Sequence, residues 1–198
     1  MSDEKKPKFS TLAIRSHEKK SNAPTPAASR CLIVTTGEGQ TGHLIAELLL
    51  TDEHFSSRLA RLYVATCNSE HQHIADLEKK GAFIVACTPG DLKGTTKAFM
   101  HTGADTILVV PPSVDNKLNA SKEMLQATKN AKIPNVVLLS SAGCDMAERD
   151  TQPRLREFID IESELMAAKG TEIRHSPCII RWGSFFSFFL HCDSSTDA

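Results

Sequence analysis

The chain has 198 residues, of which 40% are hydrophobic and 24% charged, a balance typical of a soluble globular protein with one domain and an extension. Its formal charge of −1 is unevenly spread, because residues 1–30 carry +4 and the remainder carries −5. A folded part without excess positive charge argues against direct nucleic-acid binding. No stretch reaches the ~18 uninterrupted apolar residues of a membrane span. We therefore expect no direct nucleic-acid or membrane partner.

The chain is expected to consist of a disordered basic tail at 1–29, a folded domain at 30–190 and a flexible C-terminus at 191–198. The tail is rich in Lys, Ser and Pro and has little periodic hydrophobicity, so it cannot offset the entropy of ordering. A mitochondrial leader is the alternative interpretation, weakened by three acidic residues.

Six cysteines lie far apart, without a Cys-x-x-Cys pair or a preceding secretory leader. We expect reduced thiols in a cytoplasmic protein, with the nucleus as the alternative location. A metal site at Cys67, Glu70, His71 and His73 is disfavoured, because His71 and His73 are two residues apart on an expected helix and would point about 200° from one another. Three cysteines lie in apolar runs and are expected to be buried: Cys31, Cys87 and Cys178.

From residue 31 onward, short and nearly continuous apolar runs alternate with helical segments. Such runs are typical of strands covered on both faces, and the alternation predicts an α/β fold with a mostly parallel sheet. One helix is expected over 119–131, and another to begin with a capping box formed by Ser69 and Gln72. The six expected strands are Cys31–Thr35, Leu62–Thr66, Ala82–Cys87, Thr106–Val110, Asn135–Leu139 and Pro177–Arg181.

Gly37, Gly39 and Gly42 form G-x-G-x-x-G directly after the first expected strand and just before an apolar helix. Gly37 would allow the tight turn, Gly39 would leave no side chain between backbone and pyrophosphate, and Gly42 would let helix pack on strand. The free N–H groups and dipole of the helix N-terminus would then face a phosphate. The motif predicts a bound nucleotide on a Rossmann-type, doubly wound parallel sheet with three αβα layers; a plain turn is the alternative.

Two further stretches follow expected strands. Thr88–Leu92 lies where an adenine ring would rest, although a Pro-Gly turn with a helix cap at Asp91 explains it equally well. Pro111 and Pro112 follow the fourth strand and would stiffen a loop facing the nucleotide, or act as simple strand breakers.

The stretches "TTGEGQTGHLIAELL", "GDL", "ILVVPPS", "VVLLSSAG" and "IIRWGSFF" occur in the order seen in NmrA-like proteins, and residues 31–190 resemble this fungal branch of the atypical short-chain dehydrogenases/reductases. The resemblance implies an NAD(P)-binding Rossmann domain, with a smaller C-terminal lobe completing the substrate pocket. Some members reduce quinones or similar carbonyl compounds; others are non-catalytic redox sensors that bind transcription regulators.

The sequence departs from this pattern at catalytic positions. Reductases of the wider group use a Tyr-x-x-x-Lys pair, but the only tyrosine is Tyr63, inside an expected strand, with Cys67 four residues on. Phe158 and Ile159 stand where many relatives carry a lysine, and Trp182 where proline is usual. We assign no catalytic residue, and whether the chain is an enzyme stays open.

The cofactor is expected to be NADP, with NAD as the alternative. Neither an arginine nor an acid stands at the end of the second strand, and Asn68, Ser69 and His71 could hydrogen-bond a 2′-phosphate. Ser140 and Ser141 resemble a substrate-binding serine, but we favour a role in completing the nucleotide pocket. The expected cofactor-binding residues are Gly37, Glu38, Gly39, Gln40, Thr41, Gly42, Cys67, Asn68, Asp91, Leu92, Pro111, Pro112, Ser140 and Ser141.

Little sequence follows the last expected strand, whereas the family continues into the substrate lobe. We therefore expect a shortened form that lacks most of this lobe, or one completed by a second subunit. The aromatic run over 185–189 would be exposed, or would fold back as a short helix. The expected function is a nucleotide-dependent redox sensor acting on a regulatory protein, or a weak quinone reductase; a protein-interaction module with a vestigial loop is the alternative.

Overall fold

The computed structural model describes residues 30–167 and 176–183 of the chain. Within these residues, six strands form one sheet in the order β3-β2-β1-β4-β5-β6, and every neighbouring pair is parallel. This order confirms the predicted doubly wound α/β sheet of the Rossmann type. The strands are β1 (Arg30–Val34), β2 (Leu59–Thr66), β3 (Phe83–Ala86), β4 (Thr106–Val109), β5 (Asn135–Ser141) and β6 (Ser176–Trp182).

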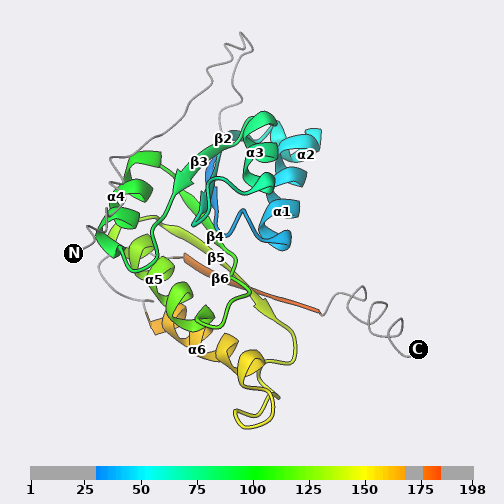
Figure 1. Cartoon of the computed structure of the whole chain (residues 1–198), viewed down its shortest axis with the longest axis vertical. Helices are drawn as coiled ribbons and strands as arrows, with labels where there is room; N and C mark the ends of the chain where they lie inside the picture. Colours follow the sequence, from blue (N-terminus) through cyan, green and yellow to red (C-terminus); the bar gives the residue numbers. More distant parts are fainter. Residues whose placement is uncertain (1–29, 168–175, 184–198) are drawn as a thin grey trace, which may run out of the picture.

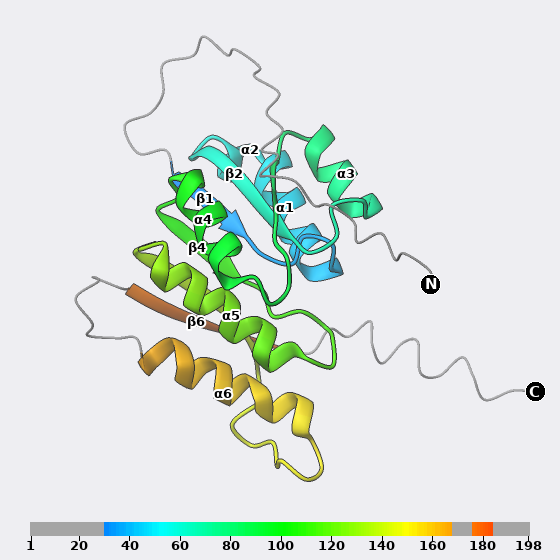
Figure 2. The same cartoon turned by 60° about the vertical axis from the view of Figure 1, so that its left-hand side comes forward.

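Helices cover both faces of the sheet, as Figures 1 and 2 show. One face carries α1 (Gln40–Thr51) and α3 (Gln72–Lys79), with the short α2 (Glu53–Ser56) following α1. The other face carries α4 (Leu92–Thr102), α5 (Lys117–Asn130) and α6 (Pro153–Ala167). The result is the expected three-layer arrangement. None of these helices has the length and hydrophobicity needed to span a bilayer.

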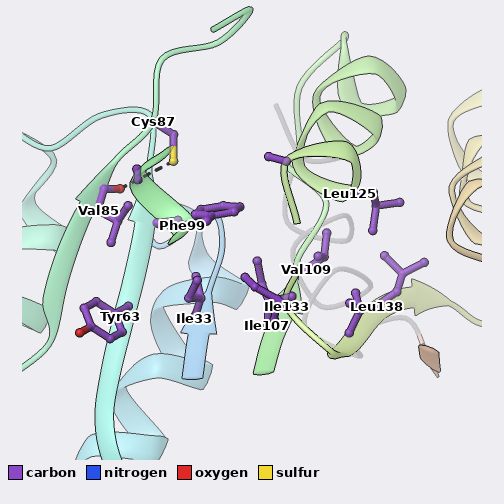
Figure 3. Packing of buried hydrophobic residues seen from close by; sticks show 14 of the residues in the cluster. Ile33, Tyr63, Val85, Cys87, Phe99, Ile107, Val109, Leu125, Ile133 and Leu138 are labelled. Atoms are coloured by element: carbon purple, nitrogen blue, oxygen red, sulfur yellow. Dashed lines mark hydrogen bonds between the residues drawn. The ribbon is translucent and has the colours of Figure 1, made fainter. Parts of the chain in front are cut away.

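Alternation along the strands fills two cores. Tyr63, Ala65 and Val85 pack into the cluster beneath α4, α5 and α6, part of which is drawn in Figure 3, whereas Val64 and Ile84 pack beneath α1 and α3. Because both faces are covered, every position of a central strand favours an apolar residue. This explains why the expected strands lie within a few residues of the observed ones.

Two expectations about local structure are wrong. The capping box of Ser69 and Gln72 does not form, because Asn68 closes a tight turn by accepting the N–H of Glu70 through Oδ1 (3.2 Å). Helix α3 therefore begins at Gln72, with His71 as its N-cap. The thiol of Cys178 is exposed rather than buried, and Cys31 is only partly buried. Cys178 lies on β6, which pairs with β5 alone among the described strands and alternates exposed with half-buried positions.

Three predictions lie outside the described residues: the tail at 1–29, the aromatic run over 185–189 and the C-terminus at 191–198. The boundaries of the predicted domain at 30–190 therefore stay a prediction.

Candidate functional site

The glycine motif lies at the switch point of the sheet, between the carboxyl end of β1 and the start of α1. A Cβ on Gly42 would lie 2.2 Å from the carbonyl oxygen of Thr36, and one on Gly37 would lie 2.1 Å from Cγ1 of Val64. A Cβ on Gly39 would meet only ordinary or slightly tight neighbours, the nearest being Cγ2 of Thr36 at 3.2 Å. Gly37 and Gly42 are thus required for packing, whereas Gly39 is not.

The left-handed residue of this turn is Thr36, with φ of 58°. A β-branched residue in this region is strained by about 1–3 kcal/mol. Its Oγ1 donates to the carbonyl oxygen of Val110 (2.6 Å), and Thr35 Oγ1 accepts from the N–H of Val110 (2.9 Å). Thr36 therefore supplies the left-handed conformation of the turn and is held there by bonds to the residue that follows β4, whereas Gly37 allows the turn because it has no side chain to clash with Val64.

Helix α1 presents its N-terminus at this loop. Its N-cap is Gly39, in an extended conformation, and no side chain among the described residues caps the helix. The first turn of α1 holds no acidic residue. Uncapped N–H groups and the positive end of a twelve-residue helix favour an anion here. Gln40 and Thr41, both predicted cofactor residues, form the first turn.

A pocket of about 180 Å³ lies on one side of the loop, at the carboxyl ends of β4, β5 and β6. Four predicted residues line it, namely Thr41, Pro111, Ser140 and Ser141, whereas Pro112 does not. The remaining lining residues are Val110, Leu139, Phe158, Trp182 and Gly183. The volume is below the ~300–1,000 Å³ of typical ligand sites. Trp182 and Gly183 form one wall, and the chain beyond them lies outside the described residues.

Phe158 contributes an aromatic wall to this pocket from α6. The Nζ of Lys117, at the start of α5, lies 4.1 Å from the centroid of the Phe158 ring and 3.3 Å from Oε2 of Glu157. Lys117 is buried, which lowers its pKa. A cation therefore lies against the ring that occupies the expected lysine position, an arrangement the sequence analysis did not anticipate.

Ser140 belongs to a buried polar network behind the pocket. Its Oγ donates to Oε1 of Glu162 (2.5 Å), and Arg181 donates to both carboxylate oxygens through Nε (3.0 Å) and Nη2 (2.9 Å). The hydrogen bond from Arg181 lowers the pKa of Glu162. The Ser140 hydroxyl proton is thus donated to Glu162, whereas the Ser141 hydroxyl makes only a long bond to the carbonyl oxygen of Ala142 (3.4 Å). Ser141 is therefore the more available hydroxyl donor for a bound molecule. Glu162 was missed, although its spacing of four from Phe158 puts both on one helix face.

The other half of the site lies at the carboxyl ends of β2 and β3. Glu38, from the glycine loop, reaches the tip of β2, where its Oε1 accepts from the N–H of Cys67 (3.4 Å). Its Oε2 is buried without a hydrogen-bond partner in the described structure. Glu123 of α5 accepts from the N–H of Gly90 (2.9 Å), and its Oε1 is likewise buried and unpaired within residues 30–167 and 176–183.

The structure places the remaining predicted residues around this half. Asn68 forms the turn after β2. Asp91 is the N-cap of α4, where it accepts from the N–H of Gly94 (2.9 Å), in agreement with the helix cap considered above. Leu92 packs against the core cluster beneath α4. The predicted residues therefore lie in two groups at the carboxyl edge of the sheet, one on each side of the loop after β1.

The expectation that His71 and His73 point apart is wrong. His71 is an N-cap outside α3, so the two rings lie with centroids 4.7 Å apart, and His43 of α1 stacks on His73 at 4.3 Å. The Nδ1 of His73 lies 2.9 Å from the carbonyl oxygen of Glu38, which ties α3 to the glycine loop. Across the described part of the chain, no three His, Cys, Asp or Glu side chains are arranged to hold a metal ion.

No family model and no curated protein sequence matches this chain. Its structure is similar to the NADPH-dependent quinone oxidoreductase of Escherichia coli complexed with NADPH, with a TM-score of 0.67 and 19% identity over 81% of this chain and 51% of that one. It is also similar to the Citrobacter sp. triphenylmethane reductase complexed with NADP(H), with a TM-score of 0.65 and 19% identity over 80% and 51%.

A third similar structure is the UDP-glucose 4-epimerase of Brucella ovis in complex with NAD, with a TM-score of 0.60 and 16% identity over 77% of this chain and 51% of that one. At these identities, the structural similarity shows a shared fold alone. The chain spans about half the length of each of these three structures.

Proposed function

We propose that the chain is an NmrA-like NAD(P)-binding protein that holds a nicotinamide dinucleotide along the carboxyl edge of its sheet. The observation that carries the proposal is the junction of β1 and α1, where an uncapped helix N-terminus meets a backbone left open at Gly39. Packing alone explains why Gly37 and Gly42 carry no side chain. It does not explain the missing side chain at Gly39, where a Cβ would have no severe clash. A pyrophosphate there would accept hydrogen bonds from the first N–H groups of α1.

The residues on either side of the junction fit the two ends of a dinucleotide. Glu38 and Glu123 each have a buried carboxylate oxygen without a donor among the described residues. An adenosine would supply donors through its ribose hydroxyls and its adenine amino group. On the opposite side, the pocket lined by Pro111, Ser141 and Phe158 would take the nicotinamide.

The two candidate cofactors differ at the Glu38 carboxylate. A ribose 2′-hydroxyl donates to a carboxylate, whereas a 2′-phosphate offers no proton and is repelled. Asn68 and His71, the side chains considered for a 2′-phosphate, both act as acceptors in the structure, Asn68 from the N–H of Glu70 and His71 from the N–H of His73. The preference between the two cofactors therefore rests on the Glu38 carboxylate. We infer that the reduced and oxidised forms of NAD bind more tightly than those of NADP.

A bound nicotinamide cofactor would supply hydride for reduction of a quinone or similar carbonyl compound. This chain would contribute orientation: the Ser141 hydroxyl as donor to the acceptor oxygen, and the Phe158 ring as an apolar wall that excludes water. With no tyrosine in the pocket, the proton would come from solvent.

A second candidate function is nucleotide sensing without turnover. It is favoured by the committed proton of Ser140 and by Phe158 at the expected lysine position. A regulatory protein or a second subunit as partner, and a cytoplasmic location, stay predictions.

The test is a titration of the full chain with NADH, NADPH and their oxidised forms, followed by calorimetry and by fluorescence of Trp182, the single tryptophan. Saturable binding supports the proposal, and its absence at millimolar nucleotide refutes it. Binding together with NADH oxidation by a panel of quinones supports the reductase; binding without turnover supports the sensor.

A further inference from the structure

Cys67 and Cys87 are neighbours across the ends of two parallel strands. The register of β2 and β3 pairs Thr66 with Ala86 at its last position, so the next residues along the strands are these two cysteines. The N–H of Cys87 donates to the carbonyl oxygen of Thr66 (2.8 Å), which is the ladder bond expected when Cys87 lies opposite Cys67. The ladder stops there, because the N–H of Asn68 turns back to Oγ1 of Thr66 (3.0 Å).

Extending the pattern of β2 by one residue beyond its end places both side chains on the same face of the sheet. Tyr63 and Ala65 of β2, together with Val85 and Cys87, belong to the core cluster beneath α4 to α6, whereas Val64 and Ile84 belong to the opposite cluster. Continuing the alternation of β2 by two residues from Ala65 places Cys67 on the face of Cys87. Figure 3 shows Val85 and Cys87 close to Tyr63 and Phe99 on this side.

The spacing suits a disulfide. Neighbouring strands lie about 4.8 Å apart, and bridged cysteines have Cα atoms about 4.4–6.8 Å apart. The two thiols also differ in access, since Cys67 is exposed and Cys87 is buried. An oxidant in solution can therefore reach Cys67 first, and Cys87 is positioned to react with it next.

The surroundings of the two sulfurs are apolar and acidic. Although Cys67 is exposed, the groups packed around its sulfur remove part of its hydration and so raise the pKa of the thiol, and the charges of Glu38 and Glu123 raise it further. Burial raises the pKa of Cys87 to about 12, and the neighbouring Cys67 adds to this effect. Because the thiolate is the reactive form, we expect slow oxidation that becomes faster at alkaline pH.

We propose that Cys67 and Cys87 form a reversible disulfide that closes the adenosine end of the nucleotide site. The oxidant is a low-molecular-weight disulfide, RS–SR. The Cys67 thiolate attacks one sulfur, forming a mixed disulfide and releasing RS⁻; Cys87, after losing its proton, attacks Cys67 and releases the second RS⁻. In total, two protein thiols are oxidised to one disulfide, and one RS–SR is reduced to two RSH.

The effect on nucleotide binding rests on the proposed function, but formation of the bridge does not. The bridge would lie at the edge where the adenosine is expected, and it would fix Cys67, whose N–H now bonds to Glu38. We expect the oxidised chain to bind NADH at least tenfold more weakly than the reduced chain.

The bridge is tested by incubating the reduced full chain with oxidised glutathione at pH 8 and digesting it with trypsin without reductant. Each cysteine falls in a peptide of its own, 62–79 and 81–93. The expected result is a linked pair of these peptides that dithiothreitol separates. Cys87→Ser should instead trap glutathione on Cys67, whereas Cys178→Ser, which removes another exposed thiol, should behave as the natural sequence does.

A stable glutathione adduct on Cys67 of the unsubstituted chain, with no linked peptides, would overturn the proposal. So would a bridge that leaves the NADH affinity unchanged in the oxidised protein, since closure of the site is part of it. If the reduced chain fails to bind any nucleotide while the linked peptides appear, the function proposed above is wrong and only the bridge remains.

Discussion

Alanine substitutions of Gly42 and Gly39, in the loop between β1 and α1, distinguish a glycine needed for packing from a glycine needed for nucleotide binding. In Gly42→Ala, the new methyl group would lie 2.2 Å from O of Thr36, 2.8 Å from its carbonyl carbon and 2.9 Å from O of Thr35. All three are backbone atoms, so α1 must move away from β1. Such overpacking costs about 1–3 kcal/mol, partly offset by ~1 kcal/mol of helix propensity. The net loss of about 1 kcal/mol lowers Tm by roughly 2–4 °C.

In Gly39→Ala, the methyl group would meet the Thr36 side chain at 3.2 Å, and the backbone, at φ of −77° and ψ of 151°, suits any residue. We expect a stability loss below about 1 kcal/mol. The methyl group would, however, separate a pyrophosphate from the backbone. Loss of one or two charge-assisted hydrogen bonds, at about 1.5–3 kcal/mol each, weakens binding by at least tenfold.

The assay pairs thermal unfolding with NADH titration on the same preparations. Gly103→Ala is the matched control, because it strains a left-handed C-cap at φ of 62° away from the site; it should lower Tm and leave the NADH Kd unchanged. Unimpaired binding by Gly39→Ala would refute the placement of the pyrophosphate at this loop. An unchanged Tm for Gly42→Ala would refute the packing argument.

Three further substitutions test other parts of the site. Glu38→Gln should improve the affinity for NADPH relative to NADH about tenfold, since one repulsive charge is removed (~1.4 kcal/mol), as measured by titration with both cofactors; equal changes for both would contradict the assignment. Asp91→Ala should lower the free energy of unfolding by about 1 kcal/mol, because α4 loses its N-cap, and should leave the NADH Kd nearly unchanged. Urea unfolding and NADH titration measure the two effects, and a large loss of NADH affinity would instead indicate a binding role for Asp91. Glu162→Gln should destabilise the chain by about 1.5–3 kcal/mol. The pKa of Glu162 is lowered in the folded state, so its contribution to the free energy of unfolding is present above the ordinary carboxyl pKa and is lost as the pH falls through the folded value. The natural sequence should therefore unfold at lower urea concentrations below about pH 4.5. The variant should lack this part of the pH dependence.

The sequence alone determined which segments are strands and that they form a doubly wound parallel sheet. Apolar runs of five or six residues identify strands covered on both faces, and their alternation with helices allows few topologies. Gly39 could be placed because its environment is local, involving only the end of one strand and the first turn of the next helix. Asp91 could be interpreted as a cap for the same reason, since its partner Gly94 is three residues away.

Only the tertiary structure decided which distant side chains meet. Glu38 reaches Cys67 across 29 positions, and Glu162 lies between Ser140 and Arg181 because α6 packs over β5 and β6. Thr36 takes the left-handed conformation because Val110, far along the chain, accepts its hydroxyl proton. The register of β2 and β3 ends at Thr66 and Ala86, so it makes Cys67 and Cys87 the next residues along neighbouring strands. Register and helix packing depend on the whole core, so no local pattern of residues specifies them.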